Sequence, residues 1–428
     1  MTPGSRLLII TNILSEVLCE ISLSDVPTDT ILNKWYRKNR YAGSKDRKEI
    51  SDSIFGILRH YYIINNIIYD KFTSYNLSNS IKFALIYYVL FKYNYEEVVN
   101  LLDDGPYAIK MNNEISTYLE AIKQISFSNN FKNEGLPDWI YKEFLITYKN
   151  ETQNVCESLL DQSNIDIRVS KDSDREKILN KILNFDKLAH KTIYSPYGIR
   201  LSKRIAFNVI KNLKNYFIEF QDEGSQLAIL LSGVKDNEVV LDLCAGAGGK
   251  TLMLCDIKKN VKIIATDIDS SRLLKIKKRL SWDKYKNRIE LYENFINLDL
   301  LVDRVICDVP CSGSGAWRRR PEEKIRITKK RFQELINIQS KILLKGANLL
   351  KVGGELVYIT CSLLKKENSD QIENFIKKNS EFEIVDLKYS WNNIVKSDSW
   401  IGDSSFCQLL PNINKCDGFF VARLRKNK

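Results

Sequence analysis

The chain has 428 residues and a mass of 49.7 kDa, which corresponds to roughly three domains at about 150 residues each. Hydrophobic residues make up 44% and charged residues 28%, close to globular averages, which excludes a disordered or collagen-like chain. Lys and Arg number 65 against 53 Asp and Glu, a net charge of +12. This basic surplus favours a polyanionic partner, nucleic acid first, although solvated lysines on helix faces would give the same number.

The nine cysteines and two histidines show no metal-site spacing. There is no CxxC pair, and His60 and His190 are isolated, so we expect no structural zinc site. An odd number of cysteines without short spacings also argues against a secreted disulfide framework. The apolar stretch 7–18 is interrupted and has helical spacing, and the stretch 83–91 is too short to span a membrane. We therefore expect a cytoplasmic protein with no metal and no membrane association.

Three segments of the chain differ in their hydrophobic period. Residues 1–160 carry helical stripes separated by loop signals, which predicts an all-helical domain. Residues 161–222 combine strand-like alternation with a helix and a turn, which predicts a small α+β linker domain. Residues 223–428 alternate buried strands with helices, which predicts a Rossmann-like α/β domain with a doubly wound, mostly parallel sheet.

A glycine-rich loop, DLCAGAGGKT, follows the first strand of that predicted sheet, at residues 242–251. Cys244 stands where a Walker A loop needs glycine, which disfavours a nucleoside triphosphatase, and Thr251 stands where a dinucleotide fingerprint needs glycine. Small residues here let backbone N–H groups approach a ligand. Asp267 ends the next strand, where a carboxylate accepts hydrogen bonds from ribose hydroxyls. Together these features predict a nucleoside cofactor without a required pyrophosphate, S-adenosylmethionine.

Two cysteines and an aspartate follow two later strands. Asp308 and Cys311 lie at the end of one and Cys361 at the end of another, where open α/β sheets bind ligands. Thiols beside a nucleoside cofactor suit methylation of pyrimidine C5, in which a thiolate adds to C6 and makes C5 nucleophilic. An acid hydrogen-bonded to N3 assists that addition, and Asp308 can serve. The chemistry alone leaves open which thiol attacks.

Residues 215–425 resemble the Sun/RsmB family of 16S ribosomal RNA cytosine-C5 methyltransferases. The resemblance rests on ordered motifs, which are FQDEGSQL at 220–227, the glycine-rich loop, RL at 272–273, DVPCSG at 308–313, RRRP at 318–321, GG at 353–354, YITCS at 358–362, EN at 367–368 and DGFF at 417–420. The helical part is similar to the NusB-like RNA-binding domain of the same proteins, mainly through SKDR at 44–47 and GILR at 56–59.

The resemblance implies a role for each thiol and a set of cofactor contacts. Cys361 would be the nucleophile that attacks C6, and Cys311 would assist release of the methylated product. The implied cofactor contacts are Cys244, Ala245, Gly246, Ala247, Gly248, Gly249, Lys250, Asp267, Glu293 and Asp308. Glu293, with Asn294 next to it, stands where the family has Asp-Ala; Gly246-Ala247 replaces the commoner Ala-Pro, and Leu364 to Lys366 replaces a usual proline.

Basic and aromatic residues after the Cys311 loop predict an RNA contact. Trp317 precedes three arginines, and guanidinium planes with an aromatic ring stack on splayed bases and clamp phosphates. An ion-pair cluster with Glu322 and Glu323 is the structural alternative. A second basic cluster, in residues 37–48, fits an RNA contact or a solvated face equally well. The predicted RNA-binding residues are Arg272, Arg318 and Arg319.

These features predict a monomeric S-adenosylmethionine-dependent enzyme that makes 5-methylcytosine in 16S ribosomal RNA through a covalent Cys361–C6 adduct. One alternative is a methyltransferase that acts on tRNA with the same site. Another is a non-catalytic RNA-binding assembly factor that works through its helical domain. The sequence identifies neither the modified cytosine nor the base that removes the C5 proton.

Overall fold

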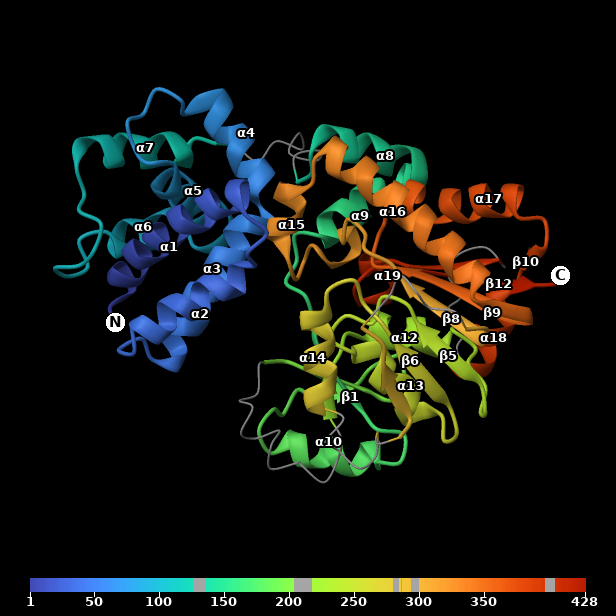
Figure 1. Ribbon diagram of the computed structural model, residues 1–428. Helices are drawn as coiled ribbons and strands as arrows, with labels where there is room; N and C mark the ends of the chain where they lie inside the picture. Colours follow the sequence, from blue (N-terminus) through green and yellow to red (C-terminus); the bar gives the residue numbers. More distant parts are fainter. Residues whose placement is uncertain (126–134, 204–217, 280–284, 286, 294–299, 397–404) are drawn as a thin grey trace. The chain divides into compact units, whose positions relative to one another are not determined.

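The computed structural model describes the chain in seven stretches, which are residues 1–125, 135–203, 218–279, 285, 287–293, 300–396 and 405–428 (Figure 1). The chain divides into two compact units. One contains residues 1–162 together with 317–327, and the other contains residues 163–316 and 328–428. The segment 161–222, predicted as a linker domain, thus folds almost entirely within the second unit.

The first unit is built from helices packed on one apolar core. Its helices are α1 (Pro3–Leu23), α2 (Thr28–Lys38), α3 (Ser44–Arg59), α4 (Tyr61–Lys71), α5 (Asn79–Tyr87), α6 (Tyr95–Leu101), α7 (Asn113–Lys123), α8 (Asp138–Tyr148), α9 (Thr152–Ser158) and α15 (Pro321–Arg326). Helical spacing places Leu7, Ile10, Leu14 and Val17 on one face of α1, where all four are buried. Asn94 caps α6 by accepting a hydrogen bond from the Glu97 N–H.

The segment 317–327 is fixed to the helical unit by buried polar groups. Lys324 Nζ donates hydrogen bonds to the carbonyl oxygens of Arg59 and Gly135, at 2.7 and 2.8 Å. Arg326 Nη2 donates to the carbonyl of Val26 at 2.7 Å. The Lys324 side chain is only 1% exposed, and burial lowers its pKa to about 7, with the positive Arg59 adding to the effect.

The second unit contains two sheets. A small antiparallel sheet has the order β2-β3-β1-β4 and is covered by α10. The larger sheet has the order β10-β12-β9-β8-β5-β6-β7, with β11 paired to β12. The strands are β1 (Ile165–Val169), β2 (His190–Lys191), β3 (Gly198–Leu201), β4 (Ile218–Phe220), β5 (Val239–Asp242), β6 (Lys262–Ala265), β7 (Ile289–Leu291), β8 (Val302–Asp308), β9 (Leu350–Thr360), β10 (Phe382–Ile384), β11 (Phe406–Leu409) and β12 (Phe419–Lys426), and the first helix is α10 (Arg175–Leu183).

Strands β9, β8, β5, β6 and β7 run parallel, and β10, β11 and β12 add antiparallel pairs at one end. The predicted Rossmann-like α/β sheet is therefore present, with a larger antiparallel part than expected. The chain leaves β5 toward β6 on one side and reaches β8 on the other, so the strand order reverses between β5 and β8. Ligands of open α/β sheets bind outside the carboxyl ends of strands at such a switch point.

Helices cover both faces of the larger sheet because its strands alternate their apolar side chains. Val240 and Ile306 pack in one buried cluster, with α12 (Glu223–Leu230), α13 (Gly249–Ile257) and α18 (Leu387–Ile394). Leu241 and Val305 point into the opposite cluster, with α16 (Lys329–Asn348) and α17 (Ser369–Lys378). The remaining helices are α14 (Ser270–Arg279) and α19 (Pro411–Asn414).

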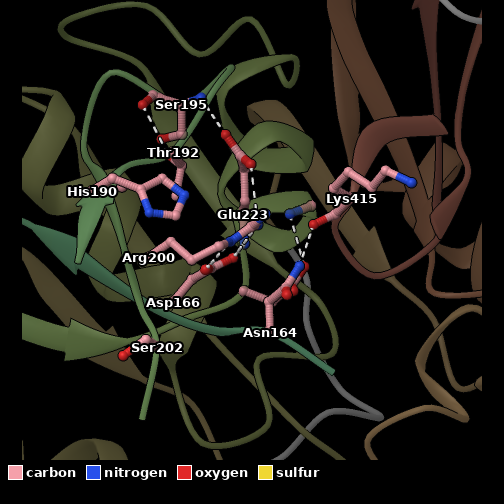
Figure 2. A network of polar contacts seen from close by, with 12 residues as sticks. Asn164, Asp166, His190, Thr192, Ser195, Arg200, Ser202, Glu223 and Lys415 are labelled. Atoms are coloured by element: carbon pink, nitrogen blue, oxygen red, sulfur yellow. Dashed lines mark hydrogen bonds and ion pairs between the residues drawn. The ribbon is translucent and has the colours of Figure 1, made fainter. Parts of the chain in front are cut away.

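Figure 2 shows the polar network that joins the small sheet to α12. Arg200 of β3 donates to both carboxylate oxygens of Asp166 on β1, at 2.8 and 2.9 Å. The Glu223 N–H donates to Asp166, and the buried Glu223 carboxylate accepts from the N–H groups of Tyr194 and Ser195 at 2.7 and 2.8 Å. The motif FQDEGSQL therefore has a structural role, since its glutamate anchors the neighbouring turn.

We expect Lys324 to make the helical unit more stable as pH rises above 7. An unfolded lysine keeps its proton to about pH 10.4, whereas the folded Lys324 loses it near 7, so unfolding takes up a proton in that window. In Lys324→Met this pH dependence is absent, and the stability of the wild type should rise relative to the variant between pH 7 and 10. Urea-dependent hydrogen exchange of peptides from residues 1–125 measures this difference.

Lys142→Met, a change at an exposed lysine of α8, is the matched control and should give a curve parallel to that of the wild type. A constant difference between the wild type and Lys324→Met across this pH range would contradict the expectation.

Candidate active site

The two predicted cysteines lie against each other at the carboxyl edge of the parallel sheet. Cys361 directly follows β9, Cys311 lies three residues past β8, and the two strands are parallel neighbours. Their sulfur atoms are 3.4 Å apart, and both side chains are partly buried. The register pairs Asp308 with Ile359, so the strands end level with one another and present both thiols at one point.

The contact between the sulfurs acts on the proton of the Cys311 thiol. The pKa of the Cys311 thiol is raised well above its ordinary value, first by its hydrogen bond to the Cys361 sulfur and then by burial. A second negative charge beside that sulfur would be strongly unfavourable. This raised pKa keeps the Cys311 thiol protonated at neutral pH.

An ion pair lies next to the thiols. Lys250, in the first turn of α13, places Nζ 2.7 Å from Asp308 Oδ2 at the end of β8. Burial alone would lower the pKa of Lys250, but the carboxylate of Asp308 outweighs it and raises that pKa, with Cys361 contributing further. The ammonium also lies 5.2 Å from the centroid of the Phe419 ring. Lys250, predicted as a cofactor contact, is thus also a charged neighbour of the thiol pair.

The glycine-rich loop turns tightly before α13. Gly246 and Gly248 adopt the left-handed φ values of 56° and 84°, which side chains other than glycine rarely adopt. A Cβ on Gly246 would also come within 2.7 Å of Arg272 Nη2. By contrast, a Cβ on Gly249 would meet no atom within 4 Å, so the start of α13 borders open space. The loop therefore leaves room for a ligand at the positively polarised end of this helix.

Asp267 is held beside that loop. Its side chain is 3% exposed, Oδ2 accepts the Gly246 N–H at 2.8 Å and Oδ1 accepts the Asp269 N–H at 2.9 Å. A carboxylate offers about four acceptor positions, so capacity remains for hydroxyl donors. Beneath the loop, burial raises the pKa of Asp242 to about 7, although the Thr251 hydroxyl donates to it at 2.7 Å.

The other residues predicted for cofactor binding differ in exposure. Ala245 is buried, Cys244 is half-buried and Ala247 is exposed within the glycine-rich loop. Glu293 is exposed two residues after β7. Its alternative, Asn294, lies outside the described residues.

The residues predicted to bind RNA are divided between the two units. Arg272 is 53% exposed, and its Nη1 lies 3.5 Å from Asp267 Oδ2, at the cofactor loop. Arg318 is only 4% exposed, and its carbonyl accepts a hydrogen bond from Arg59 in the helical unit. Arg319 is half-buried in the same segment. Arg319 and Arg272 therefore keep more exposed surface than Arg318.

One buried acid beside the thiols had no role assigned from the sequence. Glu367 accepts hydrogen bonds from residues of both cysteine loops. The sequence signal that could have revealed it is a serine directly after each cysteine. Within the described residues there is no cluster of three or more His, Cys, Asp or Glu side chains that could hold a metal ion. None of the helices in the described part of the chain is both long and apolar enough to cross a membrane.

Residues 228–425 match the family model described as 16S rRNA methyltransferase RsmB/F. The predicted family resemblance is confirmed. The ribosomal RNA small subunit methyltransferase B of Pectobacterium atrosepticum is 28% identical over 304 residues, which cover 68% of this chain and 66% of that protein. The protein of the same name from Shewanella oneidensis is 33% identical over 211 residues, 48% of this chain and 47% of the relative. The first of these matches thus spans just under two thirds of the relative's length.

Solved structures share the fold. The crystal structure of PH0851 is 21% identical, has a TM-score of 0.77 and covers 100% of this chain and 99% of its own. The structure of NSun6 from Pyrococcus horikoshii with SFG is 17% identical, has a TM-score of 0.57 and covers 68% of this chain and 99% of its own. At these identities the likeness concerns the fold, which is that of a Rossmann-like methyltransferase with a parallel sheet.

We expect Cys361→Ala to make Cys311 more reactive toward iodoacetamide. Removing the neighbouring sulfur removes the largest cause of the raised Cys311 pKa, and each unit of decrease gives about tenfold more thiolate at neutral pH. Peptide mapping by mass spectrometry at pH 7.5 would give the rate, with the exposed Cys19 as internal standard. An unchanged ratio of Cys311 to Cys19 alkylation would show that the sulfur contact does not control the Cys311 proton.

Proposed function

We propose that this protein methylates C5 of a cytosine in 16S ribosomal RNA, with S-adenosylmethionine as methyl donor. The observation that carries the proposal is the pair of thiols 3.4 Å apart, one of which keeps its proton, next to the Asp308–Lys250 ion pair. In a reaction that forms a covalent substrate adduct and then breaks it, one thiol can act as the nucleophile while a protonated group beside it assists its departure. The match to the RsmB/F family and the names of the curated relatives favour ribosomal RNA as substrate.

The residues around the glycine-rich loop fit S-adenosylmethionine. Open space at Gly249 and the free acceptor positions of Asp267 suit its amino-acid part and its ribose hydroxyls, respectively. The NSun6 structure was obtained with SFG, an analogue of S-adenosylmethionine, in the same fold. When bound, S-adenosylmethionine supplies an electrophilic methyl group.

Each polar residue then has a task in the reaction. The Cys361 sulfur adds to C6 of the cytosine, which makes N3 more basic and C5 nucleophilic. Asp308 engages N3, and Lys250, 2.7 Å from its carboxylate, is the donor that can supply a proton to it. After C5 has taken the methyl group, a base removes its proton, the electrons of that C–H bond form the C5=C6 double bond, and the bond between Cys361 and C6 breaks. The protonated Cys311, in contact with Cys361, is placed to assist this release.

The helical unit would bind RNA, as a NusB-like domain of a cytoplasmic, monomeric enzyme. A hollow of about 500 Å³ on this unit is lined by Asn33, Tyr36, Arg37, Arg40 and Arg47. The Arg47 guanidinium lies 5.4 Å from the centroid of the Tyr36 ring, and the Tyr36 hydroxyl donates to the Arg47 carbonyl at 2.9 Å. Three guanidinium groups around one hollow suit phosphate oxygens, and this favours an RNA contact for the cluster in residues 37–48.

We expect Cys361→Ala to abolish methylation of 16S RNA and Cys311→Ala to accumulate a covalent RNA adduct. The first variant has no nucleophile, whereas the second forms the adduct but releases it slowly. Transfer of a radioactive methyl group measures the first effect, and a denaturing gel of the protein–RNA mixture measures the second. Methylation by Cys361→Ala at the wild-type rate would overturn the proposal.

The same assay separates the alternatives for the substrate. Activity on tRNA but not on 16S RNA would favour the tRNA enzyme, and binding of RNA without methylation of any fraction would favour a non-catalytic assembly factor. Bisulfite mapping of RNA from a deletion strain would then identify the modified cytosine.

We expect the double variant Arg37→Gln/Arg40→Gln to bind RNA more weakly and with less dependence on salt. Each lost phosphate contact should reduce the slope of log K against log salt by about 0.7 for single-stranded RNA. Fluorescence anisotropy at several salt concentrations measures the slope. Lys142→Gln/Lys187→Gln removes two exposed positive charges elsewhere and should leave the slope close to that of the wild type. Equal slopes for the two double variants would show that Arg37 and Arg40 are solvated surface residues that do not contact RNA.

A further inference from the structure

A serine directly follows each cysteine of the pair, and both serines bind one carboxylate. Glu367 Oε2 accepts hydrogen bonds from the Ser312 hydroxyl and the Ser362 hydroxyl, each at 2.5 Å. Glu367 Oε1 accepts the Ser312 N–H at 2.8 Å. A single side chain therefore connects the residue after Cys311 to the residue after Cys361.

This carboxylate is deeply buried, and both of its oxygens accept hydrogen bonds. Glu367 is 0% exposed, lies in the short turn Lys365–Glu367 before α17, and also accepts a hydrogen bond from Gln339 of α16 at 2.9 Å. Burial raises its pKa, although the bonds from Ser312, Ser362 and Gln339 act in the opposite direction. Burying a carboxylic acid costs free energy of folding that an apolar side chain in the same place would not cost. The arrangement is therefore best explained by the geometry that the carboxylate fixes.

Other hydrogen bonds also join the two cysteine loops, but they involve different residues from those that Glu367 binds. The Gly315 N–H donates to the Cys361 carbonyl at 2.9 Å, and the Leu363 N–H donates to the Ser314 hydroxyl at 2.7 Å. These bonds join the two loops through Ser314 and Gly315, which lie three and four residues after Cys311. Glu367 binds the residue next to each cysteine, and it also holds together the two serine hydroxyls, which lie 3.3 Å apart.

We propose that Glu367 is a positioning residue that sets the separation of the Cys311 and Cys361 sulfurs. The contact of 3.4 Å lets one thiol act on the leaving group formed by the other, and a carboxylate that ties the two loops together maintains it. The catalytic consequence rests on the proposed function, whereas the separation of the thiols is a property of the protein without RNA.

The separation can be measured through disulfide formation. With a hydroperoxide as oxidant, two thiols and one ROOH give one disulfide, ROH and water, so two electrons pass from the sulfurs to the peroxide. The rate of the step that closes the disulfide depends on how close the second sulfur is held to the first. Reduced protein is treated with a small excess of hydrogen peroxide, and the Cys311–Cys361 peptide is quantified by mass spectrometry over time.

We expect the disulfide to form about tenfold or more slowly in Glu367→Gln, because the amide has one acceptor oxygen instead of two and presents a donor to a serine hydroxyl. Glu373→Gln, a change at an exposed acid of α17, is the matched control and should react like the wild type. The buried Cys255 and Cys407 should stay unalkylated in all three proteins, which excludes general unfolding. A wild-type rate of disulfide formation in a folded Glu367→Gln protein would overturn the proposal.

Ser362→Ala provides a second variant that leaves the carboxylate and its bonds to Ser312 in place. It should slow disulfide formation less than Glu367→Gln does, and it decides the question if Glu367→Gln fails to fold: a wild-type rate in Ser362→Ala would then overturn the proposal.

With RNA and S-adenosylmethionine, Glu367→Gln should form the covalent RNA adduct and release it slowly, as Cys311→Ala does. If the wild type neither forms an adduct nor methylates RNA, the proposed function fails while the peroxide experiment still decides the role of Glu367. If Glu367→Gln methylates normally despite slow disulfide formation, the positioning role has no catalytic consequence and that part of the proposal is wrong.

Discussion

The parallel pairing of β8 with β9 is the constraint on which the site depends. Backbone hydrogen bonds hold the two strands in a register that ends both at one edge of the sheet, so residues about fifty positions apart in sequence become neighbours. Asp308, Cys311 and Cys361 all follow from this register. A shift of one residue would turn each side chain to the opposite face and separate the thiols. The strand order, which reverses between β5 and β8, then places the glycine-rich loop next to them.

Charges that are buried in pairs or networks shape the chemistry of this edge. Lys250 and Asp308 neutralise each other near the thiols, and Glu367 is satisfied by donors from three segments. In such a setting a charge acts strongly on the pKa of its neighbours, because the surroundings do not screen it as water would. The pKa of the Cys311 thiol is raised by its hydrogen bond to the Cys361 sulfur, by burial and by the negative charge of Glu367 nearby.

The sequence predicted those parts of the fold that depend on local pattern. The runs that contain β5, β6, β8 and β9 are short, apolar and followed by glycine or polar residues, so their position and the convergence of Asp308, Cys311 and Cys361 could be inferred. The serine after each cysteine hints at a shared partner, but it does not identify Glu367, because Ser312 and Gln339 come from other elements. The period of hydrophobic residues predicts which side chains of a strand are buried, but it does not specify which polar groups meet in the folded interior.

The segment 317–327 illustrates the same limit. Its four arginines and two glutamates resemble a solvent-facing or RNA-facing stretch, yet Arg318, Glu322 and Lys324 are buried. Their partners, such as Thr28 and Arg59, lie far earlier in the chain. Their burial depends on tertiary contacts that composition does not encode. The chain enters the helical unit at Trp317 and returns to the other unit at Thr328, within five residues of Ser312 on the way in.

This excursion of the chain has a practical consequence for dividing the protein. A fragment that begins after residue 162 would keep the whole methyltransferase sheet but would still carry Trp317 and Lys324, now without the helices that enclose them. The side chains of Trp317 and Lys324, which are buried in the whole protein, would then be exposed to water, and Lys324 would lose the carbonyl oxygens that accept its hydrogen bonds. Truncation at residue 162 therefore does not separate the two units, because residues 317–327 of the first unit remain in the second fragment.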